Sequence, residues 1–335
     1  MSKPRTPHLV PPAAPRELSN AARTEGAPFD GDWIASTRVN RAAVERRIAT
    51  LAGRRTVKKE WQAAWLLKAV TLMDLTTLSG EDTDDRVRRL CAKARHPVRA
   101  DMLEALGASG LDIKVGAVCV YHEMIAPARD ALKGAGIPVA AVSTGFPAGL
   151  SSFNTRVQEI RDSVAAGADE IDIVISRRHV LNGDWRALYD EVKAFREACG
   201  PAHLKAIIAT GELGNMPKIA KASLACMMAG ADFIKTSTGM EAINANPPVS
   251  LVMLRAIRDF HERTGQRIGF KPAGGIATAK QALAYLILVK EELGGDWLDP
   301  ALFRFGASRL LGDIERQLEH HLTGRYSAAN RHPIG

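Results

Sequence analysis

The 335-residue sequence lacks any apolar run long enough to cross a membrane, and its first twenty residues lack the apolar stretch of a signal peptide. It has few cysteines: Cys91, Cys119, Cys199 and Cys226 show neither paired nor metal-type spacing. Free thiols that pack as small apolar residues are typical of a reducing compartment. We therefore expect a soluble, cytoplasmic protein without disulfides and without a membrane partner.

Clustered metal ligands are also missing. None of the nine histidines falls in an expected strand beside acidic residues, and His203, the nearest case, has no such companion. No Gly-rich dinucleotide fingerprint follows the first expected strand, which argues against a doubly wound open sheet. The sequence thus predicts no metal and no cofactor, with a metal-dependent barrel aldolase or isomerase as a rival interpretation.

The net charge of +8 raises the question of a nucleic-acid partner. Most of the excess lies in residues 1–60, which hold 12 Lys and Arg against 6 Asp and Glu, and no basic recognition motif is present. A solvated basic helix explains this pattern, and a mildly positive field would help to gather an anionic small substrate. We expect no nucleic-acid partner, and a non-catalytic barrel or nucleic-acid-binding protein is the weaker alternative.

The N-terminal region differs in composition from the rest. Six of the 17 prolines fall in the first 30 residues, which predicts disorder, and a transit peptide is the less favoured alternative. Helical periodicity follows in RAAVERRIATLAG and EWQAAWLLKAV. The expected organisation is a Pro-rich disordered leader (1–35), an N-terminal helical extension (36–65), a barrel (66–323) and a flexible C-terminal tail (324–335).

From residue 70 onward, strand and helix patterns alternate. Short runs rich in Val and Ile, apolar on both faces as parallel strands are, occupy 70–76, 114–121, 139–145, 169–176, 203–210, 232–238, 267–273 and 301–307. Helical patterns lie near 82–94, 124–134, 155–167, 184–199, 217–229, 248–264, 279–292 and 308–322, with capping-box spacings at Thr155 and Thr278. Eight such units predict an α/β fold, a (β/α)8 TIM barrel.

Four ionisable residues interrupt these apolar strands: Asp172, Lys205, Lys235 and Lys271. A buried charge is costly unless it is paired or used. Successive separations of 33, 30 and 36 residues match one strand–helix unit each, which predicts a single interior site. The repeated AGAD before Asp172 and Lys235 places these two at similar height, with Lys205 and Lys271 expected on either side of Lys235.

This constellation suits nucleophilic lysine chemistry. Desolvation and a neighbouring cation both lower a lysine pKa, so Lys235 between two basic neighbours could attack a carbonyl as a free amine. The iminium that results is an electron sink for breaking a C–C bond, and Asp172 could hold a water that moves the protons. The alternative is that each lysine reaches solvent from a strand end or forms a structural ion pair.

Glycine-rich segments follow the last two expected strands. Loops in these positions, with a helix N-terminus, commonly bind phosphate in barrel enzymes, although GG and GAS are also ordinary turn sequences. The predicted cradle consists of Thr238, Gly239, Gly274, Gly275, Gly306 and Ser308.

Several blocks of the sequence resemble the deoxyribose-phosphate aldolase family, in the expected order from about residue 65 to 323. They are TLMDLTTL (71–78), AVCVY (117–121), GADEIDIV (167–174), LKAIIATGEL (204–213), ADFIKTSTG (231–239), GFKPAGG (269–275) and FRFGAS (303–308). The resemblance implies a metal-free class I aldolase that interconverts 2-deoxy-D-ribose 5-phosphate with D-glyceraldehyde 3-phosphate and acetaldehyde. Another Schiff-base or metal-dependent TIM-barrel aldolase acting on a small sugar phosphate is the alternative.

The family pattern assigns roles to positions of this chain. It implies that Lys235 forms the Schiff base, that Lys271 lowers its pKa, and that Asp172 relays protons with Lys205 and water. Substrate-binding or pocket-lining positions would be Asp74, Thr76 and Cys119, with plain packing as the alternative for the cysteine. The resemblance also implies a homo-oligomer, most simply a dimer.

Three positions depart from that pattern. Met240 stands where the family commonly has Lys after KTSTG, and Arg309 stands where many members have Ser or Thr after GAS. We expect Arg309 to supply the missing charge, because guanidinium binds phosphate well. Tyr326 is the only candidate for the terminal Tyr that assists proton transfer in some members, and nine residues follow it.

Overall fold

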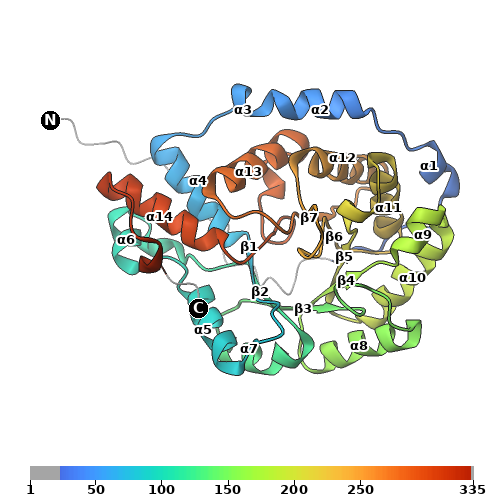
Figure 1. Cartoon of the computed structure of the whole chain (residues 1–335), viewed down its shortest axis with the longest axis horizontal. Helices are drawn as coiled ribbons and strands as arrows, with labels where there is room; N and C mark the ends of the chain where they lie inside the picture. The colour runs from blue at the N-terminus through green and yellow to red at the C-terminus, as the bar shows by residue number, and fades with distance from the viewer. Residues whose placement is uncertain (1–22, 333–335) are drawn as a thin grey trace.

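The computed structural model describes residues 23–332, and its centre is a ring of eight parallel strands (Figure 1). The strands are β1 (Met73–Thr76), β2 (Ala117–Val120), β3 (Val139–Ser143), β4 (Glu170–Val174), β5 (His203–Ile207), β6 (Phe233–Lys235), β7 (Gly269–Lys271) and β8 (Phe305–Ala307). Consecutive strands pair from β1 to β7, and β8 pairs with β1. Parallel bridges Phe270–Phe303 and Ala273–Gly306 close the ring between the β7 and β8 segments. The predicted (β/α)8 barrel is confirmed.

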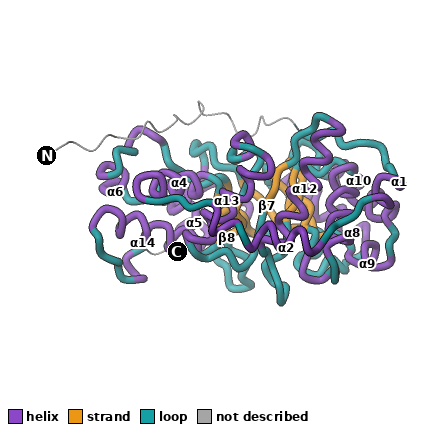
Figure 2. Tube along the Cα trace, turned by 90° about the horizontal axis from the view of Figure 1, so that it is seen from above, coloured by secondary structure: helices purple, strands orange, loops and turns teal. Residues whose placement is uncertain are grey.

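Helices surround the strands on the outside, as Figure 2 shows. They are α5 (Asp84–Arg95), α6 (Ala100–Ala105), α7 (Ile125–Leu132), α8 (Phe153–Ala165), α9 (Arg177–Asn182), α10 (Trp185–Ala198), α11 (Met216–Met228), α12 (Pro247–Thr264), α13 (Ala279–Leu293) and α14 (Leu310–Thr323). One-turn 3₁₀ helices are η2 (Ser109–Leu111), η3 (His122–Met124), η4 (Thr210–Glu212), η5 (Gly295–Trp297) and η6 (Ala329–Arg331). None of the helices within residues 23–332 has the length and apolarity needed to span a membrane.

Helix starts follow local side-chain chemistry. The capping box at Thr278 is present, with Gln281 as its partner, and it begins α13 as predicted. The capping box predicted at Thr155 is wrong. Ser152 caps α8 instead, and the backbone N–H of Thr155 donates to its hydroxyl, because the helix begins two residues earlier.

From residue 23 onward, the N-terminal segment packs on the barrel, although disorder was predicted up to residue 35. The backbone N–H of Thr24 donates to Asp232 at 2.7 Å, and Trp33 on helix α1 (Gly31–Ser36) stacks on Phe260. The leader predicted over 1–35 is therefore too long at its C-terminal end, because these aromatic residues have an apolar surface to cover. Residues 1–22 lie outside the described part.

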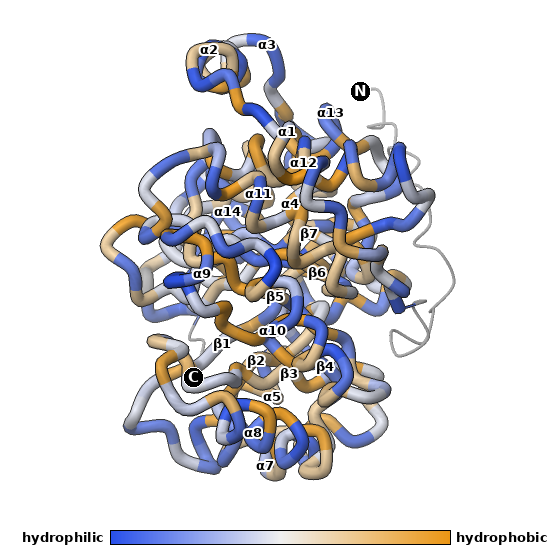
Figure 3. Tube along the Cα trace, turned by 90° about the vertical axis from the view of Figure 1, so that its right-hand side faces the viewer, coloured by the Kyte–Doolittle hydropathy of each residue, from blue (hydrophilic) through white to orange (hydrophobic). Residues whose placement is uncertain are grey.

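Helices α2 (Arg41–Ala49), α3 (Leu51–Arg54) and α4 (Lys59–Thr71) continue the chain. The first two run along the outside of the helical ring, over α12 and α13 (Figures 1 and 3). Helix α4 packs between α13 and α14 and leads directly into β1. The predicted boundary between 65 and 66 falls inside this helix, so the extension and the barrel are continuous here.

The predicted tail (324–335) also folds back where it is described. His332 is buried, and its Nε2 lies 2.7 Å from a carboxylate oxygen of Glu319 on α14. Tyr326 is exposed and stacks on His320 in the last turn of the same helix. Since α14 starts at the carboxyl ends of the strands and runs back, this places Tyr326 at the opposite end of the barrel from those strand ends.

Candidate active site

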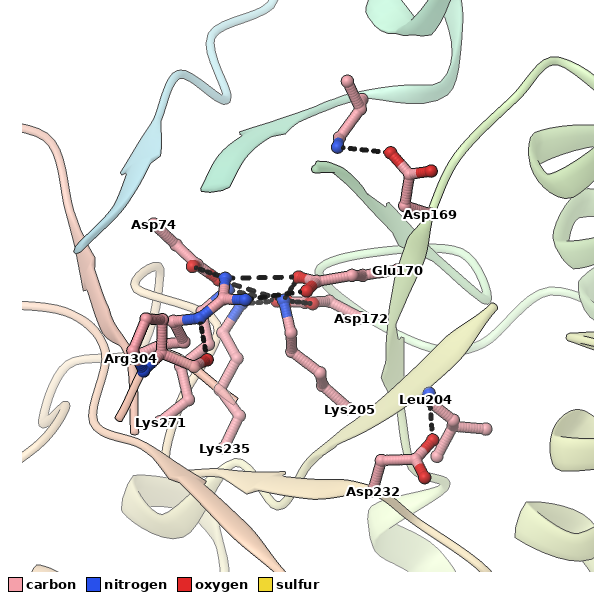
Figure 4. Close-up of polar contacts among 12 residues, drawn as sticks. Asp74, Asp169, Glu170, Asp172, Leu204, Lys205, Asp232, Lys235, Lys271 and Arg304 are labelled. Atoms are coloured by element: carbon pink, nitrogen blue, oxygen red, sulfur yellow. Dashed lines mark hydrogen bonds and ion pairs between the residues drawn. The ribbon is translucent and has the colours of Figure 1, made fainter. Parts of the chain in front are cut away.

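A cluster of seven ionisable side chains fills the barrel interior (Figure 4). None is more than 3 % exposed. The members of this interior cluster are Asp74 on β1, Glu170 and Asp172 on β4, Lys205 on β5, Lys235 on β6, Lys271 on β7 and Arg304 just before β8. Alternation along a strand explains the arrangement, since residues two apart point to the same face. Apolar residues between them, such as Ile171 and Ile173, belong to the core that packs against the helices.

Lys235 and Lys271 end neighbouring strands in register and share one acceptor. Each Nζ donates to the same oxygen of Asp172, Oδ2, at 2.8 Å. The two nitrogens therefore lie within about 5.6 Å of each other, twice that distance. The structure thus brings Asp172, in the middle of β4, together with Lys235 and Lys271 at the carboxyl ends of β6 and β7, as the strand spacing predicted.

Lys205 lies on the strand beside Lys235 but at a different depth. It is in register with Phe233, two residues before Lys235, so it lies deeper toward the amino ends of the strands. Its Nζ contacts Asp74 at 3.0 Å, Asp172 Oδ1 at 3.2 Å and also Glu170. Lys205 and Lys271 do lie on the strands on either side of Lys235, as predicted, but Lys205 is two residues deeper and contacts the other oxygen of Asp172.

The sequence reasoning missed two members of the cluster. Glu170 precedes Asp172 by two residues and therefore shares its inward face, but only Asp172 was singled out. Arg304 lies in FRFGAS, at the start of an apolar run, and met the criterion applied to the lysines. Its guanidinium bonds to Asp74 and, at 2.9 Å, to Glu170.

The interior bases differ in the direction of their pKa shifts. Burial lowers the pKa of Lys235, and the nearby charge of Lys271 lowers it further, against the opposing effect of Asp172. Burial acts in the same way on Lys205 and Lys271, but the carboxylates around them outweigh it, and the pKa of each is raised. Of the interior lysines, Lys235 is thus the one whose proton is most easily lost.

The interior carboxylates stay ionised. Burial favours their protonated forms, yet the surrounding lysines and Arg304 outweigh it and hold the pKa values of Asp74, Asp172 and Glu170 below their usual range. Asp74 was predicted to bind substrate hydroxyls, but it is fully buried and both of its oxygens are taken by interior bases. Among residues 23–332 no group of His, Cys, Asp or Glu side chains is arranged to hold a metal ion.

Two other predicted pocket residues lie beside this cluster. Cys119 on β2 is fully buried against Ala140 and Val142, and burial raises its pKa, so it is a neutral thiol. Thr76 at the end of β1 is partly exposed and donates its hydroxyl to the backbone carbonyl of Asp74 at 2.8 Å.

Three glycines of the predicted phosphate cradle lie close together after β6 and β7. Gly239, Gly274 and Gly275 all have positive φ, and a Cβ on Gly239 would lie 4.0 Å from the Cα of Gly274, so these loops adjoin. Ser308 and Arg309 are exposed at the start of α14.

Gly306 has another function in the barrel than the one predicted. Its N–H donates to Pro272 O at 2.9 Å and so cannot cradle an anion. A Cβ there would lie 2.8 Å from the Cβ of Ala273. The glycine therefore allows β8 to approach the β7 segment closely.

Thr238 is occupied by a side chain that sequence reasoning did not single out. Its N–H and its hydroxyl both donate to Oε1 of Glu241, at 2.7 and 3.1 Å. The other oxygen of Glu241 accepts from the N–H of Gly211 at 3.3 Å. A buried carboxylate thus sits on one of the predicted phosphate donors, next to the exposed Met240.

Comparisons with known proteins agree with this geometry. A model of the DeoC/LacD family aldolases matches residues 68–308. The chain is 61 % identical over 316 residues to a deoxyribose-phosphate aldolase of Mus musculus, covering 94 % of this chain and 99 % of that protein. Identity to the Homo sapiens protein of the same name is 59 % with the same coverage.

A solved structure with the same fold is the deoxyribose phosphate aldolase of Aeropyrum pernix, with a TM-score of 0.57 and 20 % identity over 84 % of this chain and 99 % of that one. The family match spans every strand from β1 to β8 and includes all seven members of the interior cluster. The chain therefore belongs to the DeoC/LacD family of aldolases.

Proposed function

We propose that this protein is a deoxyribose-phosphate aldolase, a lyase that reversibly cleaves 2-deoxy-D-ribose 5-phosphate to D-glyceraldehyde 3-phosphate and acetaldehyde. The observation that carries the proposal is the position of Lys235. Its amine lies 2.8 Å from Asp172 and close to Lys271, and its pKa is lowered, first by burial. The relatives of Mus musculus and Homo sapiens with 61 % and 59 % identity, both deoxyribose-phosphate aldolases, support the same activity.

The amine of Lys235 attacks the aldehyde carbon of the open-chain sugar and, with loss of water, forms an iminium. A water held by Asp172 takes the proton of the C3 hydroxyl, the C2–C3 bond breaks, and its electron pair moves into the iminium to give an enamine. D-Glyceraldehyde 3-phosphate leaves, the enamine carbon takes a proton, and hydrolysis of the new iminium releases acetaldehyde and the free amine.

The neighbours of Lys235 have separate tasks in this scheme. Lys271 disfavours a second positive charge beside it, which keeps the nucleophile neutral. Lys205, on the other oxygen of Asp172, holds that carboxylate ionised for proton transfer. No metal is required, because the iminium itself accepts the electron pair.

The phosphate group of the substrate binds at the loops after β6, β7 and β8. Backbone N–H groups of Gly239, Gly274 and Gly275 approach it, and the Ser308 hydroxyl and the Arg309 guanidinium complete the site at the start of α14. Arg309 replaces the charge that Met240 does not provide. Thr238 joins once Glu241 has moved away from its N–H.

Covalent trapping tests the proposal. Borohydride reduction with acetaldehyde in the presence of EDTA is expected to leave an adduct that peptide mass spectrometry places on Lys235. Folded Lys235→Ala should give no adduct and no cleavage of the sugar phosphate, whereas the exposed-site control Lys280→Ala should behave as the unmodified protein. Undiminished cleavage by Lys235→Ala would refute the proposal, and EDTA-sensitive activity would favour a metal-dependent aldolase. A cytoplasmic location and a homodimer remain predictions from the sequence.

A further inference from the structure

We propose that Arg304 and Glu170 are positioning residues for this reaction. Both lie at the amino ends of their strands, which we call the floor of the interior cluster. Their charges set the charge balance of the cluster, so that Lys235 is the one base without a carboxylate of its own. The inference rests on the proposed function, since it concerns the same lysine. It assigns a role to two residues that touch neither the substrate nor the reacting atoms.

Both residues act through intermediaries. The guanidinium of Arg304 bonds to Asp74 and to Glu170, and the carboxylate of Glu170 bonds in turn to Lys205. Lys205 contacts Asp172 at 3.2 Å, and the second oxygen of Asp172 contacts Lys235 at 2.8 Å. Each link is an ion pair between side chains that are at most 3 % exposed, so solvent screens the chain of contacts weakly.

The charge count of the interior is uneven. Its bases are Lys205, Lys235, Lys271 and Arg304, and its acids are Asp74, Glu170 and Asp172. Of the remaining strands, β2 adds the neutral thiol of Cys119, and β3 faces the interior with Ala140 and Val142. Three cations balance three carboxylates, and a fourth charge in this closed space would be unpaired and costly.

The contacts decide which base gives up its proton. Lys205 touches three carboxylates, while Lys271 and Arg304 touch two each. Lys235 touches only Asp172, through an oxygen that it shares with Lys271. A guanidinium, moreover, keeps its proton at any physiological pH. Arg304 is therefore a permanent cation, and Lys235 is the base that loses the least electrostatic stabilisation when it gives up its proton.

Removing either floor charge should change this balance in opposite directions. Without the negative charge of Glu170 the interior has two surplus cations, and Lys235 releases its proton more readily. Without the positive charge of Arg304, three bases face three acids, and Lys235 keeps its proton. A purely structural role would impair both variants without reversing the sign of the effect.

The test is the pH dependence of kcat/KM for unphosphorylated 2-deoxyribose, which has no group that titrates between pH 5 and 10. We expect the midpoint of the acid limb to fall by about 1 pH unit in Glu170→Gln and to rise by about 1 unit in Arg304→Met. The double variant should return close to the unmodified protein. Arg304→Lys, which keeps the charge, and Glu104→Gln, which changes an exposed carboxylate, should leave the midpoint unchanged.

Shifts of the same sign, or midpoints that do not move while the Lys235 adduct still forms, would overturn this inference and leave the proposed function standing. Absence of that adduct in the unmodified protein would overturn the proposed function instead. If Arg304→Met does not fold, Glu170→Gln and Arg304→Lys decide the question. A lowered midpoint in the former with an unchanged one in the latter supports the inference, and any other combination contradicts it.

Discussion

Replacing Lys271 by Met removes the cation nearest the proposed nucleophile while keeping a flexible side chain of similar length. Its Nζ and that of Lys235 lie within about 5.6 Å of each other. At that largest separation, with an effective dielectric constant of about 20, two unit charges repel by about 3 kcal/mol, which is therefore a lower limit. That repulsion corresponds to about 2 pKa units, by which the pKa of Lys235 should rise in Lys271→Met.

A second effect acts in the same direction. Asp172 Oδ2, shared between the two lysines in the present structure, would be left to Lys235 alone and would stabilise its ammonium form. Since the reaction needs the neutral amine, the rate at pH 7 should fall about 100-fold through this effect, a factor of ten for each pKa unit. The activity should be recovered in part at alkaline pH.

The assay is the rate of adduct formation with acetaldehyde against pH, followed at Lys235 by mass spectrometry. Acetaldehyde does not titrate, so the midpoint of the profile reports the lysine. Lys271→Arg is the matched control, because it keeps a positive charge in place, and its midpoint should stay near that of the unmodified protein. An unshifted midpoint in folded Lys271→Met would refute the electrostatic argument, whatever the effect on the maximal rate.

Three further predictions concern phosphate binding, packing and acid stability. Arg309→Ala should raise KM for 2-deoxyribose 5-phosphate about tenfold or more and leave KM for 2-deoxyribose unchanged. Glu241→Gln should lower KM for 2-deoxyribose 5-phosphate, because it removes a carboxylate charge from the proposed phosphate site. Equal effects on both substrates would reject these roles. Gly269→Ala should lower the free energy of unfolding by about 1–3 kcal/mol, since the new Cβ would lie 2.4 Å from the ring of Phe233. The control Gly53→Ala, with open space around it, should not lower it. Coincident denaturant unfolding curves of Gly269→Ala and the unmodified protein would contradict this. Folding lowers the pKa values of the interior carboxylates, so their stabilising contribution is present above the unfolded-state pKa of about 4 and is lost as pH falls below it. The melting temperature should therefore be level at pH 6–8 and decline below pH 4. A decline that begins near neutrality would exclude the carboxylates as its origin.

The sequence sufficed for the barrel because its signals are local and repeated. Apolar strands and amphipathic helices alternate eight times along the chain, and few architectures other than a barrel accommodate such a repeat. Strand lengths were overestimated: β6 and β7 end at Lys235 and Lys271, although the predicted strands ran to residues 238 and 273. There the backbone leaves the ladder, and Thr236 instead exchanges hydrogen bonds with the backbone of Ala273.

The sequence also indicated four of the side chains that meet in the interior. Charged residues inside buried strands must be paired or used, and this rule, together with the strand–helix spacing, singled out Asp172, Lys205, Lys235 and Lys271 but not Glu170 or Arg304. The rule could not predict how far along the barrel axis each side chain lies. Register is a long-range property of hydrogen-bonded strands, and only the tertiary structure placed Lys205 level with Asp172 and two residues deeper than Lys235, with Arg304 at the amino-terminal end of the interior.

The same limit applies to the surface loops and the termini. Whether Thr238 has a free N–H depends on how the chain after it turns: Glu241, three residues later, turns back onto that group, and the N–H of Gly211, on a distant segment, donates to its other oxygen. A proline-rich composition indicated disorder, yet Trp33 found an aromatic partner on a helix more than 200 residues away in the chain. Composition and periodicity fix what each segment is able to form, whereas contacts between distant segments decide which polar groups remain free for chemistry.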